Sequence, residues 1–484
     1  MALKPVFFII GLLLIALGLA MLIPAAVVIH VDSYDWGGFV YGAVTTIFFG
    51  VLMALANQHP LSKFQLGVRE AFLMTTLSWI FTITFASLPF ILSSHNHSIT
   101  DSLFEATSAL TTTGATIINH LDKTNPGILL WRGILQWLGG VGIIVMALTI
   151  LPLLRIGGMQ LFRTESSDRT DRIMPRVSHI AKSIIAIQAS LTIFFTIALI
   201  LVGIKPLDAI CHAMGALTTG GLSTSDNSIG GFANPAAEII IIACMFIGSC
   251  TLTLLLRVWN GDWRSFFKDP QIRGFTYILG LATCAITAWR FYHAPHTNLI
   301  DLSRETLFTV LSVTSSTGYT VTDYSSWGNF ALLFIFVLTL VGGCTGSTTG
   351  GVKIFRLQVL WTIVKTQMAQ LRRPHGVFLP HYNKQVLSEN VIYSVFTFFS
   401  LFGLTFVVIA ILLSLCQLDL ITCISASAAS ITNTGVGIGP IMTPTGNCSS
   451  MSDPAKWVMM MGMLLGRLEM MTILTLLSSR FWHR

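Results

Sequence analysis

Apolar windows long enough to cross a lipid bilayer recur along the whole chain. A transmembrane helix needs about 20 mostly apolar residues, and the sequence offers ten windows of that kind. They cover residues 5–29, 39–56, 71–92, 128–154, 184–204, 236–256, 274–290, 330–352, 391–415 and 456–477. The first window is too long for the apolar part of a removable signal peptide and lacks a convincing small-residue cleavage site, so we expect it to stay as a helix. The pattern predicts an all-α polytopic membrane protein.

Four short runs of small, hydroxyl-bearing residues interrupt this apolar pattern, and each contains a glycine. Run 1 is ATSALTTTGAT at 106–116, and run 2 is AMGALTTGGLS at 213–223. Run 3 is VLSVTSSTGYT at 310–320, and run 4 is SAASITNTGVG at 427–437. When the runs are stacked without gaps, one column holds Gly114, Gly221, Gly318 and Gly435. An internal repeat constrains the architecture more strongly than any single segment does.

The position of the four runs predicts the plan of the chain. Each run follows one apolar window and precedes the next. The segment before each glycine, at 101–110, 206–217, 302–314 and 420–431, is too short to cross and suits a helix that enters the membrane partway. We expect two N-terminal helices followed by four helix–pore-loop–helix repeats around a central pore. The predicted boundaries are 1–70 for the two-helix segment and 71–182, 183–271, 272–389 and 390–484 for repeats 1 to 4.

Such runs suit a selectivity filter. Non-helical backbone is tolerated inside a membrane only where it is buried in protein or lines a water-filled cavity. Four copies that meet on one axis would replace the hydration shell of a cation with carbonyl oxygens. A single run would be read as an ordinary turn or helix contact, but four at equivalent places favour the filter. Its predicted members are Thr112, Thr113, Gly114, Thr219, Gly220, Gly221, Ser316, Thr317, Gly318, Asn433, Thr434 and Gly435.

Composition and charge fit a membrane protein without a nucleic-acid partner. Only 10% of the 484 residues are charged, against about 25% in soluble proteins. Most of the 28 Lys and Arg residues lie near the termini or in the segments 57–70, 155–182, 257–273 and 353–390. This positive-inside asymmetry predicts that both termini are cytoplasmic, and it accounts for the net charge of +7. The basic segments 155–182 and 353–390 are candidate docking surfaces for a partner.

A glycine-rich stretch at 342–351 is the first candidate for a gate. Each glycine inside a helix costs about 1 kcal/mol relative to alanine, so we expect a flexible loop here. A helix-packing face is the alternative; a phosphate-binding loop is excluded by the spacing to the following lysine. The five glycines of this stretch are Gly342, Gly343, Gly346, Gly350 and Gly351.

Ionisable residues inside the apolar windows supply the second candidate. Arg467 lies near the middle of the last window, where a charge costs roughly 2.5–3.5 kcal/mol. We expect it to face the pore and repel cations, or to pair with a carboxylate other than Glu469, which points to another helix face. Three further cations near the outer ends of windows are explained by snorkelling: Arg132, Arg290 and Lys456. His212 is interpreted as a packed or hydrogen-bonded residue.

Taken together, these motifs resemble the Trk/Ktr/HKT superfamily of potassium transporters, and more narrowly its TrkH/TrkG branch. The resemblance rests on the four runs, on Gln136-Trp137-Leu138-Gly139-Gly140, on residues 342–351 and on Gly466-Arg467-Leu468-Glu469. It covers nearly the whole chain, and the two extra N-terminal helices fit the Trk branch. In this family a glycine in all four filter positions goes with potassium preference.

The resemblance implies a biological setting. It implies a bacterial inner-membrane protein that transports K⁺, forms a homodimer with one pore per subunit, and works with a TrkA-like cytoplasmic subunit that binds NAD or ATP. No other cofactor is implied. The unequal residues after the four glycines predict moderate selectivity. A sodium/potassium symporter, or another monovalent cation channel of the same fold, remains the alternative. A membrane enzyme is disfavoured because no cluster of acids, bases or metal ligands appears at one depth, and a purely structural subunit is disfavoured by the four runs.

Overall fold

The chain folds into a bundle of membrane-length helices with four short helices inside it. The computed structural model describes residues 3–30, 36–58, 67–93, 98–149, 173–293, 298–383, 385–443 and 447–482. Among these, six helices are long and apolar enough to span a membrane, and two bent helix pairs bring the number of possible spans to eight. The predicted all-α membrane architecture is therefore confirmed.

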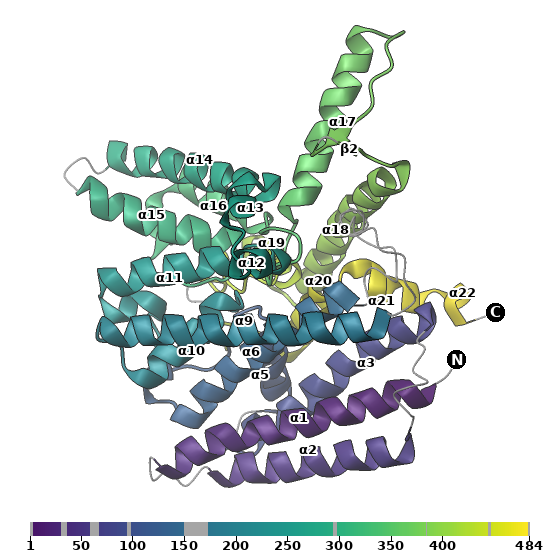
Figure 1. The fold of residues 1–484 in the computed structure, drawn as a ribbon. Coiled ribbons are helices and arrows are strands. Elements are labelled where there is room, and N and C mark those ends of the chain that lie inside the picture. Colours follow the sequence, from purple (N-terminus) through teal and green to yellow (C-terminus); the bar gives the residue numbers. More distant parts are fainter. Residues whose placement is uncertain are drawn as a thin grey trace.

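The two N-terminal helices form a pair outside the repeats. Helix α1 spans Leu3–His30 and α2 spans Trp36–Ala56. They pack closely because Gly11 and Gly50 face each other, and a Cβ on either would clash with the other's backbone. Small residues at such contacts are the usual means of close helix approach in lipid. Figure 1 places this pair along one edge of the bundle, beside α3.

Each repeat supplies an outer helix, a pore helix and a returning helix. The outer helices are α3 (Val68–Ala86, continued by α4, Leu88–Ile91), α9 (Ile173–Leu201), α14 (Pro270–His293) and α18 (Glu389–Leu415). The pore helices are α5 (Ile99–Leu110), α10 (Pro206–Leu217), α15 (Leu299–Thr314) and α19 (Leu420–Thr432). The returning helices begin with α6 (Pro126–Thr149), α11 (Pro235–Gly248), α16 (Asn329–Thr339) and α20 (Asp453–Arg467).

The remaining elements lie in the loops and after the returning helices. Short 3₁₀ turns η2 (Leu121–Lys123), η3 (Ser228–Phe232) and η4 (Tyr324–Trp327) lie between pore helix and returning helix. Helices α12 (Leu252–Trp259), α13 (Trp263–Lys268), α17 (Ile354–Arg372), α21 (Met470–Leu477) and α22 (Ser479–Trp482) follow the returning helices. Strands β1 (His381–Tyr382) and β2 (Gln385–Val386) pair antiparallel, with His381 opposite Val386. Figure 1 shows α1, α2, α9 and α14 running side to side across the molecule, while α18 and α17 run upward at an angle to them. Helix α17 also projects away from the bundle.

Three of the four returning helices are broken. The break in 330–352 follows the predicted glycine-rich loop, whereas the breaks in 236–256 and 456–477 correct the prediction of continuous spans there. Helices α11 and α12 meet at 104°, and α20 and α21 at 109°. Helix α16 ends at Thr339, because the glycine-rich stretch that follows is not helical. The first repeat differs, since α6 continues to Thr149; its predicted end at 154 lies outside the described residues.

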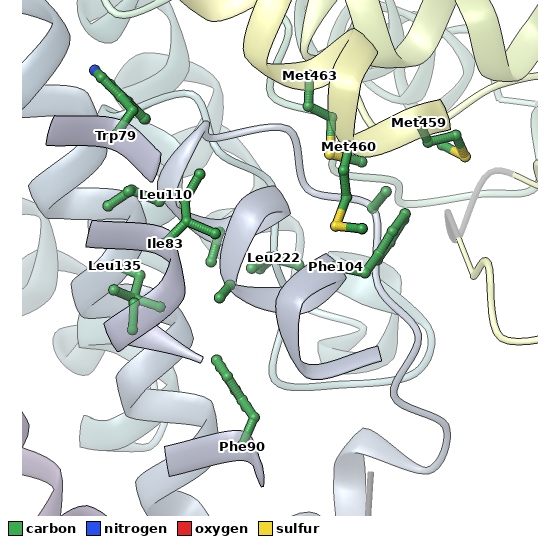
Figure 2. Close-up of a cluster of buried hydrophobic side chains, with 14 of the residues drawn as sticks. Trp79, Ile83, Phe90, Phe104, Leu110, Leu135, Leu222, Met459, Met460 and Met463 are labelled. Carbon is green, nitrogen blue, oxygen red and sulfur yellow. The ribbon is translucent and has the colours of Figure 1, made fainter. Parts of the chain in front are cut away.

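Apolar side chains hold the pore helices in place. Figure 2 shows Phe104 of α5 beside Met460 of α20, and Ile83 of α3 near Leu110 at the end of α5. Phe104 is fully buried. Because lipid is as apolar as these side chains, close packing rather than transfer from water stabilises this arrangement.

Candidate functional site

The four runs leave their pore helices with the same backbone conformation. Two residues before the glycine, Thr112, Thr219, Ser316 and Asn433 have φ of 52°, 54°, 57° and 53°. At the glycine, Gly114, Gly221, Gly318 and Gly435 have φ of 88°, 76°, 81° and 71°. The left-handed region is costly for residues with a Cβ. Four repetitions of the same unusual backbone show that the runs are structurally equivalent.

The runs close into a ring. A Cβ built on Gly114 would collide with the carbonyl oxygen of Gly220, and one on Gly221 with that of Thr317. The same holds for Gly318 against Thr434, and for Gly435 against Thr113, which returns to run 1. Each glycine therefore lies against the carbonyl that precedes the glycine of the next run. Only glycine combines the positive φ with this close approach.

Each run is braced against its own pore helix. The N–H before the glycine donates to a carbonyl five residues earlier in every repeat. These bonds join Thr113 to Ser108 (2.8 Å), Gly220 to Gly215 (2.7 Å), Thr317 to Ser312 (2.9 Å) and Thr434 to Ala429 (3.0 Å). In three repeats two hydroxyls also pair: Thr111 with Thr113, Ser315 with Thr317, and Thr432 with Thr434. The hydroxyl-rich composition therefore serves to rigidify the turn, since satisfied buried polar networks favour one conformation.

Neighbouring runs are joined by a different polar contact at each boundary. Arg132 of α6 links runs 1 and 2 through Thr116 and the Ser223 carbonyl. Between runs 2 and 3, the Tyr319 hydroxyl donates to the Leu222 carbonyl at 3.3 Å. The hydroxyl of Tyr324 (η4) donates to the Gly437 carbonyl of run 4 at 2.8 Å. The Asn433 amide of run 4 donates to the Thr113 hydroxyl of run 1 at 3.0 Å. The four runs are therefore equivalent in backbone conformation, but the polar contacts that join neighbouring runs differ.

A small cavity opens at the outer side of the ring. Its volume is about 20 Å³, roughly the space of one water. Gly114, Gly221 and Gly318 line it from three runs, and Val436 lines it from the fourth. Arg132 and Asp226 also line this cavity, and are the charged residues among its described walls. A cation that reaches the ring from this side would pass both of them.

The glycine-rich stretch, residues 342–351, forms a non-helical loop directly beneath the ring. A Cβ on Gly350 would collide with the Thr432 carbonyl and approach Asn433 at 3.2 Å. The Thr219 hydroxyl donates to the Thr348 hydroxyl at 3.2 Å. The loop therefore contacts runs 2 and 4 from the side opposite the outer cavity. We call residues 342–351 the intramembrane loop.

The broken helix of repeat 2 accommodates the intramembrane loop. The Cys344 N–H donates to the Ser249 carbonyl at 3.0 Å, and the Leu252 N–H donates to the Gly346 carbonyl at 3.2 Å. The Thr251 hydroxyl donates to the Thr345 carbonyl at 2.9 Å. The break between α11 and α12 thus exposes backbone groups that pair with the loop. This satisfies polar groups of both segments within the membrane, as an apolar environment requires.

Arg467 binds the intramembrane loop rather than a carboxylate. Its Nη1 donates to the Thr348 carbonyl at 2.8 Å, and its Nη2 donates to the Gly139 carbonyl of α6 at 3.3 Å. Arg467 is only 4% exposed. Glu469 pairs instead with Arg356 of α17 at 3.0 Å. The two gate candidates, which the sequence could only name separately, are therefore in direct contact.

The three cations predicted to snorkel are all paired, which corrects that prediction. Arg132 forms an ion pair with Glu105 at 2.7 Å, Arg290 with Glu305 at 2.8 Å, and Lys456 with Asp101 at 2.6 Å. Arg132 and Lys456 are buried. Carboxylates on the pore helices reach these cations, so their charge is neutralised within the protein. The available signal was the acidic residues of the first and third pore segments, Asp101, Glu105 and Glu305, since such residues are costly within a membrane unless paired.

His212 is packed and hydrogen-bonded, as predicted. Its Nδ1 lies 2.7 Å from the Asp208 carbonyl and its Nε2 lies 3.0 Å from the Ser223 hydroxyl. The ring also stacks edge-on against Phe232. His212 thus supports run 2 from behind through Ser223.

Comparison with known proteins finds relatives that match this chain over nearly its whole length. The Trk system potassium uptake protein TrkI of Halomonas elongata is 39% identical over 99% of this chain and 97% of its own length. The Trk system potassium uptake protein TrkH of Vibrio parahaemolyticus is 35% identical over the full length of both chains. The crystal structure of the potassium transporter TrkH from Vibrio parahaemolyticus matches all of both chains with a TM-score of 0.93 and 34% identity.

The family assignment follows from the sequence as well as from the fold. The TrkH model, described as a cation transport protein, matches residues 38–484. This range includes all but the first two residues of α2 and all four repeats. The resemblance inferred from the four runs is confirmed, and the chain belongs to the TrkH family of cation transport proteins.

Proposed function

We propose that this protein takes up potassium across the inner membrane of a bacterium, and that the four runs are its selectivity filter. The observation that carries the proposal is the closed ring, in which each glycine lies against a carbonyl of the next run. Carbonyl oxygens suit a dehydrated alkali cation. The relatives named as potassium uptake proteins support potassium as the cargo.

In this proposal the intramembrane loop is the gate and Arg467 holds it closed. The loop lies under the ring and contains no large side chain. Arg467 ties the Thr348 carbonyl to the Gly139 carbonyl, and so fixes the loop to the first repeat. A guanidinium beside the path would also repel cations. Opening then requires the loop to leave these contacts.

A cytoplasmic partner would control this gate from α17. Helix α17 begins directly after the intramembrane loop and projects from the bundle (Figure 1). Several apolar side chains on it are exposed, among them Trp361, Met368 and Leu371. In the proposal, a TrkA-like subunit that binds NAD or ATP docks on 353–390 with both termini on the same side, and the working unit is a homodimer. Of the other basic segment, 155–182, residues up to 172 lie outside the described residues.

Reconstitution into liposomes tests the proposal. The purified protein should carry ⁸⁶Rb⁺ inward down its gradient, potassium should compete fully, and sodium should compete weakly. Uptake should follow an imposed membrane potential without a proton or sodium gradient; uptake only with such a gradient would favour the sodium/potassium symporter. Equal transport of sodium and rubidium, or transport of neither, would overturn the potassium filter.

A further inference from the structure

A buried ion pair lies behind runs 1 and 2. Glu105 of the pore helix α5 and Arg132 of α6 are joined by an Oε1–Nε distance of 2.7 Å, and their side chains are 1% and 2% exposed. Removing two charges from water is costly, and such a pair persists only where further hydrogen bonds satisfy it. Its location beside the ring, rather than at a helix end, therefore needs a reason.

The pair forms hydrogen bonds with equivalent positions of two adjacent runs. Glu105 accepts from the Thr116 hydroxyl at 3.0 Å and from the Ile117 N–H at 3.0 Å. Arg132 donates from Nη2 to the Thr116 hydroxyl and from Nη1 to the Ser223 carbonyl, each at 3.1 Å. Thr116 stands two residues after Gly114, and Ser223 stands two residues after Gly221. The pair thus sets the spacing between runs 1 and 2 just outside the glycines.

The pair also sets the charge at the outer cavity. Arg132 lines this cavity together with glycines of runs 1, 2 and 3. A guanidinium does not lose its proton in a protein, so its positive charge is permanent. Glu105, at 2.7 Å, is the carboxylate that cancels it. Asp226 also lines the cavity, but its carboxylate accepts from the Leu121 N–H of η2 at 2.8 Å.

We infer that Glu105 and Arg132 are a positioning pair for cation uptake, which rests on the filter proposed above. The pair has two separable roles. Arg132 fixes the distance between runs 1 and 2 through its fork of donors. Glu105 removes the electrostatic barrier that Arg132 would otherwise present to a cation at the outer end of the ring. The contacts described above at the other three boundaries between runs are uncharged. Among the four, the contact between runs 1 and 2 is the one made by a charged side chain.

Three variants separate the two roles. Glu105→Gln keeps the shape of the side chain but leaves the Arg132 charge uncancelled. The double variant Glu105→Gln with Arg132→Gln removes both charges. Arg132→Lys keeps the charge and loses the fork that reaches Thr116 and Ser223 together, since lysine is not a planar bidentate donor. Each is purified, checked by size-exclusion chromatography, and assayed for ⁸⁶Rb⁺ uptake across a range of concentrations with sodium as competitor.

The expected pattern is specific. Glu105→Gln should raise the KM for rubidium about tenfold or more, because an uncompensated unit charge a few ångströms away opposes a cation strongly. The double variant should recover much of that KM while discriminating less against sodium. Arg132→Lys should keep a nearly normal KM and lose selectivity. If Glu105→Gln fails to fold, the double variant and Arg132→Lys still test the inference through KM and selectivity.

A second ion pair gives a matched control. Glu238 of α11 pairs with Arg304 of α15 at 2.8 Å and does not line the outer cavity. Glu238→Gln should leave the rubidium KM and the sodium competition unchanged. Equal effects of Glu238→Gln and Glu105→Gln, or a folded Glu105→Gln protein with normal KM and selectivity, would overturn the inference. Absence of rubidium uptake by the unmodified protein would instead refute the proposed function.

Discussion

Four residues with side chains hold a left-handed backbone at the same position of the ring. Thr112, Thr219, Ser316 and Asn433 each have φ between 52° and 57°, at a cost of roughly 1–2 kcal/mol per residue. All four are buried. Such strain persists only where the surrounding structure determines it, and it gathers at functional sites. Its fourfold repetition indicates that the carbonyl that follows each of these residues is held in place for a purpose.

The glycine of run 4 is the most crowded of the four and gives the sharpest single-residue prediction. A Cβ on Gly435 would meet the Thr113 carbonyl and also approach the Ala115 nitrogen at 2.6 Å. We expect Gly435→Ala to push run 1 away and to reduce rubidium uptake and its preference over sodium by about tenfold, since this positive φ alone costs about 1–2 kcal/mol. Competition of sodium with ⁸⁶Rb⁺ uptake measures both.

Gly403 supplies the control for that prediction. It lies within α18, and no atom comes within 4 Å of a Cβ built there. Gly403→Ala should leave transport unchanged and should stabilise the helix by about 0.5–1 kcal/mol. If both alanine variants impair selectivity alike, the ring geometry is not the cause.

At the scale of elements, the intramembrane loop and Arg467 act as one unit. We expect Arg467→Ala to raise rubidium flux in the absence of any partner by about tenfold, because a hydrogen bond to a charged group contributes about 1.5–3 kcal/mol. Initial rates of uptake into liposomes, at equal protein content, provide the measurement.

Arg467→Lys distinguishes anchoring of the loop from simple repulsion. Lysine keeps the positive charge but does not reach the Thr348 and Gly139 carbonyls with two fixed donors. Anchoring predicts that Arg467→Lys raises flux partway toward the alanine variant, whereas repulsion predicts flux like that of the unmodified protein. Unchanged or lower flux in a folded Arg467→Ala protein would contradict both roles.

The sequence predicted the pore helices and the loop but missed the helix breaks. The pore helices were found within a few residues because each ends at a repeated, recognisable glycine run. The breaks after Gly248 and Arg467 lie inside windows that are apolar throughout. Backbone groups at the first break pair with the intramembrane loop, and the Arg467 side chain beside the second break donates to the same loop; in both cases the loop is about 90 residues or more away in sequence. A hydropathy value averages the residues of one local window, so it contains no information about partners that are distant in sequence.

One ion pair was missed for the same reason at longer range. Asp101 and Lys456, which lie in repeats 1 and 4, meet at 2.6 Å. Each residue read alone looks like a cation or acid near a helix end, where snorkelling is a sufficient explanation. Only the closure of the ring, which brings the first and last repeats together, makes them neighbours. A fourfold repeat should therefore prompt a search for charges at equivalent depths in the first and last copies.

At the scale of the whole molecule, the ring joins four segments that are each about 100 residues apart in sequence. A cation bound in the ring contacts all four repeats at once, whereas an unfolded chain has no such site. Binding to the native state alone stabilises it by about 2.7 kcal/mol at a ligand concentration 100 times Kd. We therefore expect potassium or rubidium chloride to raise the apparent Tm of the detergent-solubilised protein.

This stabilisation should depend on the identity of the cation and on the ring itself. Sodium should raise the Tm less than potassium at equal ionic strength, and choline, which is too large for the ring, should not raise it. The Gly435→Ala variant should lose the potassium dependence while keeping its response to salt in general. Membrane proteins often unfold irreversibly, so all Tm values must be taken at one scan rate. An equal shift in choline and potassium would mean that ionic strength, not a bound cation, holds the four repeats together.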